Sequence, residues 1–197
     1  MVFRAFESEN LESLEFGLKS DFFNGKARAN IAVFSYDYEN LQFQATDPDP
    51  YRGGVANIPN SEMDGVEIEF TALLGDSITF DMNLGFVDTE VTAEYEVLDN
   101  VLAYQYFFTE EQERYDLRED VRGNMLAKTP EFTADATLTY EGELASGNPI
   151  TVILQFIRRG EFMQRVSNNP FVDTVPEYQI FTLTVGMRLK QVLAIKA

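Results

Sequence analysis

The strongest constraint in this sequence is an alternation of apolar and polar residues with a period of two. It is clearest over 78–86, where Ile78, Phe80, Met82, Leu84 and Phe86 are separated by Thr79, Asp81, Asn83 and Gly85. Such alternation is typical of a β-strand with one apolar face. The pattern predicts seven strands, at about 13–23, 26–42, 62–74, 77–94, 131–141, 150–160 and 177–190. Only over 26–42 are both faces partly apolar, so the register of that strand stays open.

The connections between these strands alternate in length. Asn24-Gly25 and Gly75-Asp76 are short hairpin signals, and the connection over 142–149 is also short. The other three connections, at about 43–61, 95–130 and 161–176, are long. In an up-and-down meander all three long connections lie at one end of the sheet. The spacing of charges in 110–122 is compatible with a short helix inside one of them.

Composition excludes much chemistry. The 197 residues contain no His and no Cys, so a Ser-His-Asp triad, a thiolate nucleophile and a thiolate metal site are all excluded. The net charge of −18 argues against nucleic acid as a partner. An enzyme would have to work with carboxylates, Lys, Arg or Tyr, and we expect no enzyme, no cofactor and no metal. No secretory signal is evident, because Glu7, Glu9 and Glu12 occupy the positions of its apolar core.

Short turns, long loops and alternating strands occur together in outer-membrane barrels. A spanning strand needs about 9–11 residues, and the strands that begin near Ile78 and Phe132 are long enough. We therefore predict an all-β fold: an antiparallel up-and-down meander of about seven strands that forms part of a large transmembrane β-barrel. Aromatic residues near the strand ends are candidates for interfacial girdles: Phe34, Tyr36, Tyr38, Tyr95, Tyr140 and Phe162.

Three motifs in order resemble the barrel of the TonB-dependent outer-membrane receptors. Residues 15–20, Glu-Phe-Gly-Leu-Lys-Ser, are similar to that family's E-x-G-L-K-[ST] strand. Residues 29–42 are similar to its strand N-x-A-x-F-x-x-D-Y-x-D-L-Q, and residues 57–69 to its entry N-A-…-G-x-E-x-E. The stretch 123–130 resembles a further lead-in of the form G-…-P. The resemblance covers most of 11–190.

The resemblance implies a location and partners. We expect 1–197 to be a single partial barrel segment without a plug domain, a signal peptide or the last barrel strands. The parent receptor would lie in the outer membrane of a Gram-negative bacterium, in contact with its lipid. It would take up a scarce large solute, such as an iron–siderophore complex, from outside the cell. The TonB complex would be a partner only through the missing N-terminal part of the parent.

Several side chains are candidates for contacting that solute. The aromatic residues of one long connection would contact it as an alternative to packing within the loop: Tyr104, Tyr106, Phe107 and Phe108. Arg158 and Arg159 would clamp an anionic ligand, although arginine at the membrane interface is the simpler interpretation. Glu67 and Glu69, two positions apart on one strand, allow a carboxylate pair or a cation site, but a solvated face is favoured. The same holds for the acidic stretch 110–120.

Two rival functions remain at this level. In the first, the chain is a soluble secreted β-barrel that binds a small ligand, with its apolar faces pointing inward. In the second, it is a carboxylate-based hydrolase on an all-β scaffold. Cell fractionation distinguishes the first rival from a receptor barrel, because only the latter requires detergent extraction from the outer membrane.

Overall fold

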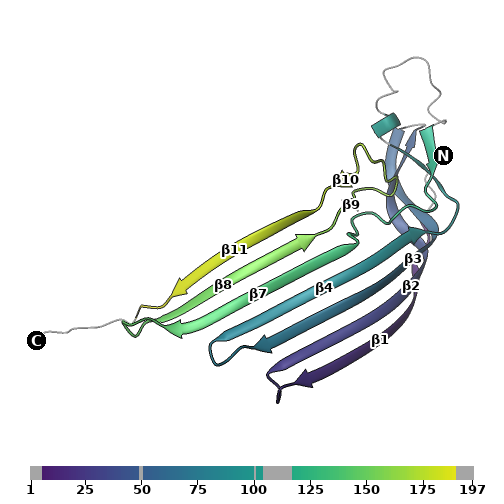
Figure 1. Ribbon diagram of the computed structural model, residues 1–197. Helices are drawn as coiled ribbons and strands as arrows, with labels where there is room; N and C mark the ends of the chain where they lie inside the picture. Colours follow the sequence, from purple (N-terminus) through teal and green to yellow (C-terminus); the bar gives the residue numbers. More distant parts are fainter. Residues whose placement is uncertain (1–5, 49–50, 100, 104–116, 190–197) are drawn as a thin grey trace, which may run out of the picture.

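The computed structural model describes residues 6–48, 51–99, 101–103 and 117–189. Seven strands form one antiparallel sheet in the order β1-β2-β3-β4-β7-β8-β11 (Figure 1). Their bounds are β1 Asn10–Phe22, β2 Ala27–Pro48, β3 Tyr51–Leu73, β4 Ile78–Val91, β7 Phe132–Glu143, β8 Pro149–Arg159 and β11 Tyr178–Met187. Four short strands complete the fold: β5 Glu96–Leu98, β6 Arg118–Asp120, β9 Phe162–Met163 and β10 Thr174–Val175. The predicted seven-stranded meander is therefore confirmed.

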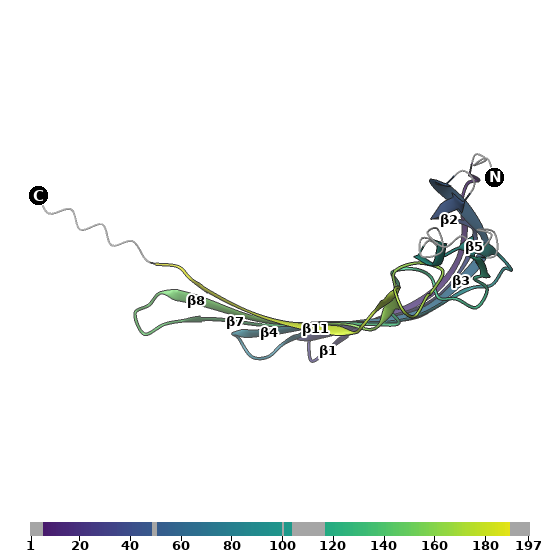
Figure 2. The same cartoon turned by 90° about the horizontal axis from the view of Figure 1, so that it is seen from above.

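The sheet is a single curved layer with two different ends. The turns β1–β2, β3–β4 and β7–β8 lie at one end, and the longer connections gather at the other, which rises to one side of the layer (Figure 2). At the first turn Asn24 and Gly25 both have positive φ, 57° and 81°, which Asn and Gly tolerate best. Among the described residues no helix is long and apolar enough to cross a membrane.

The register sorts side chains onto two faces, because partners in an antiparallel pair point to the same side. We call one side the apolar face. In β4 it presents Phe80, Met82, Leu84 and Phe86, and the pairing carries it to both neighbours, with Leu84 opposite Ile68 of β3 and Ala134 of β7. Further members are Phe16, Leu18, Ile31, Val33, Val66, Phe70, Leu138, Leu154, Phe156, Phe181, Leu183 and Val185.

The opposite side, the polar face, carries Lys19, Asn30, Glu67, Glu69, Asp81, Asn83, Asp135, Thr137, Thr139 and Gln155. Hydrogen bonds link neighbouring strands across it. The Asn30 amide donates to Glu69 at 2.9 Å, and the Thr71 hydroxyl donates to Asp81 at 2.8 Å. The sheet thus has one side suited to an apolar environment and one suited to water.

The register of β2, which its sequence leaves open, is settled by its neighbours. Val33 lies opposite Phe16 and Val66 on the apolar face, so Phe34 and Tyr36 point to the polar face. The Phe34 ring covers Gly65, where an added Cβ would lie 2.2 Å from the ring. It also stacks on Tyr36 with ring centroids 4.8 Å apart. These two aromatic residues therefore do not belong to an interfacial girdle on the apolar face.

The prediction of a long loop over 43–61 is wrong. β2 and β3 continue as a paired ribbon from Leu41–Ile58 to Pro48–Tyr51. The alternation fades there because Phe43 and Ile58 pack into a small core rather than along the main apolar face. Strand pairing uses backbone hydrogen bonds, so two strands can pair even where their side chains do not alternate between apolar and polar.

The other two long connections contain short elements. β5 pairs with β6 inside the connection 92–131, and β9 pairs with β10 inside the connection 160–177. A short helix occupies 101–103. The possible helix over 110–122 is not found where the structure describes that range, because Arg118–Asp120 is the strand β6. Residues 110–116 lie outside the described residues.

Candidate functional site at the connection end

A small core forms where the ribbon of β2 and β3 meets both connections. Its buried members are Ile58, Val91, Val97, Val121, Leu126 and Val166, with Leu41, Phe43, Met63 and Tyr95 packed against them. Val91 and Val121 are fully buried. Tyr95 meets Phe43 edge-on, with ring centroids 6.0 Å apart. This core holds the two connections at one end of the sheet.

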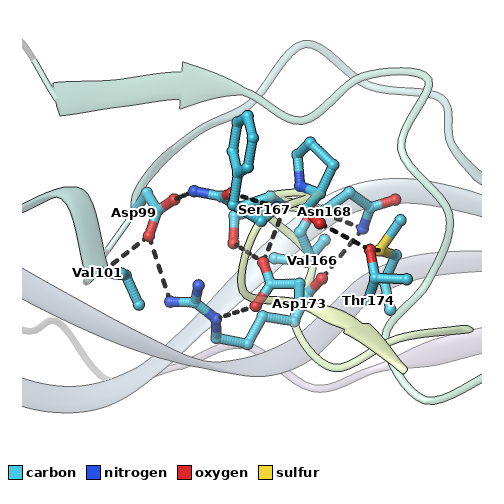
Figure 3. A network of polar contacts seen from close by, with 12 residues as sticks. Asp99, Val101, Val166, Ser167, Asn168, Asp173 and Thr174 are labelled. Carbon is cyan, nitrogen blue, oxygen red and sulfur yellow. Dashed lines mark hydrogen bonds and ion pairs between the residues drawn. The ribbon is translucent and has the colours of Figure 1, made fainter. Parts of the chain in front are cut away.

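A buried network of charged and polar groups lies beside this core (Figure 3). Arg165 donates from Nε to Asp173 Oδ1 at 2.5 Å and from Nη1 to Asp99 Oδ1 at 3.3 Å. The Asn169 amide donates to the other Asp99 oxygen at 2.6 Å. Asp99 belongs to the connection 92–131, and the other three residues belong to the connection 160–177. Arg165 and Asn169 lie 66 and 70 residues from Asp99 in the sequence, so the network joins two distant segments.

Both carboxylates of this network are withdrawn from water, with side chains 0% exposed at Asp99 and 1% at Asp173. Each accepts several hydrogen bonds, which compensates for lost hydration. Asp173 also accepts from the Ser167 hydroxyl at 3.0 Å and from the Asn169 backbone at 2.8 Å. Asp99 also accepts from the Val101 backbone at 2.8 Å, at the start of the short helix.

These contacts set the ionisation of the network. Burial by itself would raise the pKa of Asp99, but hydrogen bonds from Asn169 and the Val101 backbone, together with the charge of Arg165, outweigh it and hold that pKa below its ordinary value. Burial would lower the pKa of Arg165, whereas Asp173 and Asp99 raise it. Asp99 and Arg165 are therefore both ionised at neutral pH and form an ion pair.

The predicted arginine clamp is not assembled in the structure. Arg158 and Arg159 are consecutive in β8 and point to opposite faces. Arg158 lies on the apolar-face side, 5.6 Å from the Phe132 ring centroid, and pairs with Glu177 at 2.7 Å. Arg159 lies on the polar face and contacts Asp135 with two nitrogens, at 3.0 and 3.3 Å. A single ligand cannot engage both guanidinium groups.

The other candidate residues have separate outcomes. Tyr104, Tyr106, Phe107 and Phe108 lie outside the described residues, as does most of the acidic stretch 110–120. Glu67 and Glu69 share the polar face as expected, and Glu69 accepts the Asn30 amide. Within the described ranges no group of three or more acidic residues is arranged to hold a metal ion.

Sequence reasoning missed the buried network entirely. Asp99, Arg165 and Asp173 fall in stretches without periodicity, and nothing in their local spacing links them. The only local signal was the turn sequence Asn168-Asn169-Pro170. Asn168 adopts a positive φ of 50°, and its amide exchanges hydrogen bonds with the Met125 backbone, 3.0 Å in each direction.

An antiparallel sheet with one apolar face, one polar face, short turns at one end and elaborated connections at the other defines the wall of a transmembrane-type β-barrel. The family model described as "TonB dependent receptor-like, beta-barrel" matches residues 3–196. The chain therefore belongs to the TonB-dependent receptor β-barrel family, whose members are outer-membrane proteins of Gram-negative bacteria. No curated protein matches the sequence.

Three solved structures show the same fold at low sequence identity. The siderophore receptor PiuA from Acinetobacter baumannii is 19% identical, with a TM-score of 0.61 over 89% of this chain and 22% of that chain. The ferric yersiniabactin uptake receptor FyuA from Yersinia pestis is 14% identical, with a TM-score of 0.61 over 89% and 22%. BauA, the ferric preacinetobactin receptor from Acinetobacter baumannii, is 12% identical, with a TM-score of 0.63 over 92% and 23%. This chain spans less than a quarter of each.

Proposed function

We propose that this chain is a membrane-spanning segment of a receptor barrel that takes up a scarce large solute, such as an iron–siderophore complex, across the outer membrane of a Gram-negative bacterium. Its role is transport and not catalysis. In the receptor the connections 92–131 and 160–177 lie outside the cell, and the turns lie on the periplasmic side. The TonB complex would act through parts of the receptor other than this segment.

The observation that carries the proposal is the unbroken apolar face. It crosses all seven strands; its side chains are half-buried on most inner strands, and Phe181 and Leu183 on the edge strand β11 are 66% and 67% exposed. In β4 it runs from Ile78 to Phe86, which is eight residue steps or about 26 Å along the strand. At a tilt of about 40° this corresponds to about 20 Å along the membrane normal, close to the roughly 25 Å apolar band of such barrels.

Charge limits this band at the connection end. Four residues beyond Phe86 the same face carries a cross-strand row of carboxylates: Glu12, Asp37, Glu62 and Glu90. Carboxylates are unfavourable in hydrocarbon, so the row supports a membrane boundary below it. Arg158 lies at the connection end of β8, where a long cationic side chain can reach the headgroup layer while its stem stays near Phe132.

The solute would be met at the connection end and along the polar face. The siderophore receptor and the two ferric-chelate receptors that share this fold support an iron chelate as the solute. Arg159 on the polar face remains a candidate contact for an anionic group. Tyr104, Tyr106, Phe107 and Phe108 remain candidate contacts from the connection 92–131.

A soluble ligand-binding barrel is disfavoured by the same face. That function requires the apolar side chains to line an interior, whereas here they lie exposed on one side of a single layer. In such a barrel the polar face would be the outer surface. Met63 and Val91 lie on the polar face and belong to the small core, so the core and both connections pack on that side of the sheet at its connection end.

Epitope insertion tests the proposed orientation in a complete receptor barrel that contains this segment. A tag inserted after Phe171, which is 93% exposed, should be labelled on intact cells. A tag inserted after Asn24 should be labelled only after the outer membrane is permeabilised. Labelling of both tags on intact cells, or of the Asn24 tag alone, contradicts the orientation.

A further inference from the structure

The two connections at one end of the sheet are joined by more than proximity, and we propose that they form one cooperative unit. The Asp99–Arg165–Asp173 network, which we call the latch, locks them together, and the connection 160–177 positions the first part of the connection 92–131. The latch is a conformational device distinct from the barrel wall.

The first argument is that three kinds of contact cross between the same two segments. The latch supplies the charged contacts through Arg165 and Asn169. Backbone-directed amides supply a second set, in which Asn124 donates to the carbonyls of Val166 and Ser167 at 2.9 and 3.2 Å. Val166 supplies the third by packing into the small core. Separation of the connections would break all three sets together.

The second argument is burial. Asp99 has no exposed surface, and the side chains that pair with its carboxylate, Arg165 and Asn169, both come from the other connection. If the connections separated while Asp99 stayed packed, its charge would be left buried and unpaired, which is strongly unfavourable. The connection 92–131 therefore cannot keep its own packing around Asp99 once the connection 160–177 has moved away.

The third argument concerns what Asp99 organises locally. Its side chain accepts the Val101 backbone N–H, and its backbone carbonyl accepts that of Ala103 at 2.9 Å. Its own N–H donates to the Leu117 carbonyl at 3.4 Å. Asp99 is thus the point at which the latch fixes the backbone of the short helix at 101–103.

A second charged contact near this end of the sheet, on the apolar-face side of β8, shows by contrast why the latch acts locally. The pair Arg158–Glu177 also joins two segments, but both side chains are about half exposed, at 45% and 63%. An exposed pair of this kind adds little to stability. It provides a matched arginine–carboxylate contact at the same end of the sheet that should not couple the two connections.

Hydrogen exchange of the full chain in detergent micelles tests the proposal. Asn169→Asp keeps the oxygen that accepts the Phe171 N–H but places a second carboxylate against Asp99. At pH 8 we expect exchange at least tenfold faster in both 160–175 and 91–103, with strands β7 and β8 unchanged. At pH 5 the two carboxylates can share a proton and restore a hydrogen bond. The exchange rates, corrected for the effect of pH on intrinsic amide exchange, should then return toward those of the unaltered chain.

The control is Arg158→Gln, which should leave both connections as protected as in the unaltered chain. Arg165→Met provides a second variant that removes the ion pair without adding charge, and it should accelerate exchange in both connections at either pH. The proposal is overturned if either latch variant accelerates exchange in 160–175 alone. It is also overturned if the unaltered chain shows no protection in the two connections.

Discussion

Arginine placed along the apolar face of β4 should cost an amount that depends on its depth. The apolar run from Ile78 to Phe86 is centred on Met82. Leu84 lies about 5 Å from that centre along the membrane normal and Phe86 about 10 Å, for strand steps of about 3.3 Å at a tilt of about 40°. The costs expected for Met82→Arg, Leu84→Arg and Phe86→Arg are then about 3–4, 2–3 and 1 kcal/mol.

Two matched variants separate lipid exposure from burial in a protein core. Asn83→Arg lies on the polar face opposite Glu69, so it should be nearly silent. Leu84→Ala should cost about 1 kcal/mol or less, because lipid chains fill the space that the side chain leaves. In a soluble core the same truncation would leave a cavity and cost about 2–5 kcal/mol.

The assay is reversible denaturant unfolding in phospholipid bilayers, carried out on a complete receptor barrel that contains this segment. A graded loss of stability from Phe86 to Met82, with Leu84→Ala and Asn83→Arg both mild, supports lipid contact along β4. Comparable large losses for Leu84→Ala and Leu84→Arg would refute it, since that pair of results is the signature of a packed interior.

Three further outcomes follow. Gly65→Ala should destabilise the sheet by about 1–3 kcal/mol, because the new Cβ would lie 2.2 Å from the Phe34 ring. Gly53→Ala is the control and should have a mild effect in the same unfolding assay, because a Cβ at Gly53 would have nothing within 4 Å. Equal effects of the two substitutions would contradict the packing of Phe34 on Gly65. The pKa of Asp99 is lower in the folded chain than its unfolded value of 3.8, so the stability that this carboxylate contributes is complete above pH 3.8 and is lost as the pH falls through the folded pKa. The difference in unfolding midpoint between the unaltered chain and Asp99→Asn should therefore shrink from pH 7 to pH 3. A difference that stays constant over this range would count against the ion pair. Without detergent the chain should aggregate, because its apolar face is exposed and β1 and β11 are edge strands of the described sheet, and a monodisperse monomer on a sizing column would contradict this.

The barrel wall was readable from the sequence because one rule governs most of it. Wherever a strand separates an apolar environment from a polar one, side chains alternate, as in 78–86, and strand existence and pairing order follow from that alternation and from the turn residues. The register of β2 was not readable, because Ala32, Phe34 and Tyr36 make its polar side look apolar. Gly65 explains this: the Phe34 ring lies over the space where a side chain is missing.

The connection end obeyed no such rule. The ribbon beyond Leu41 is held by backbone pairing, and its side chains turn into a small core shared with distant segments. The latch joins residues as far apart in the sequence as Asp99 and Asp173. A buried ion pair between such distant residues leaves no pattern in the sequence around either of them. Adjacent arginines likewise suggested a clamp until strand geometry placed Arg158 and Arg159 on opposite faces.

The central claim, that the apolar face of this sheet meets lipid, is tested most directly by spin labels placed one at a time at residues 79–86 of β4 in a membrane-inserted receptor barrel. Labels at Phe80, Met82, Leu84 and Phe86 should be accessible to oxygen, which concentrates in hydrocarbon, and protected from a water-soluble paramagnetic reagent. Labels at Thr79, Asp81, Asn83 and Gly85 should show the opposite preference. Two accessibility profiles with a period of two and opposite phase are the predicted result, and profiles without alternation, or with the phases exchanged, would contradict the account.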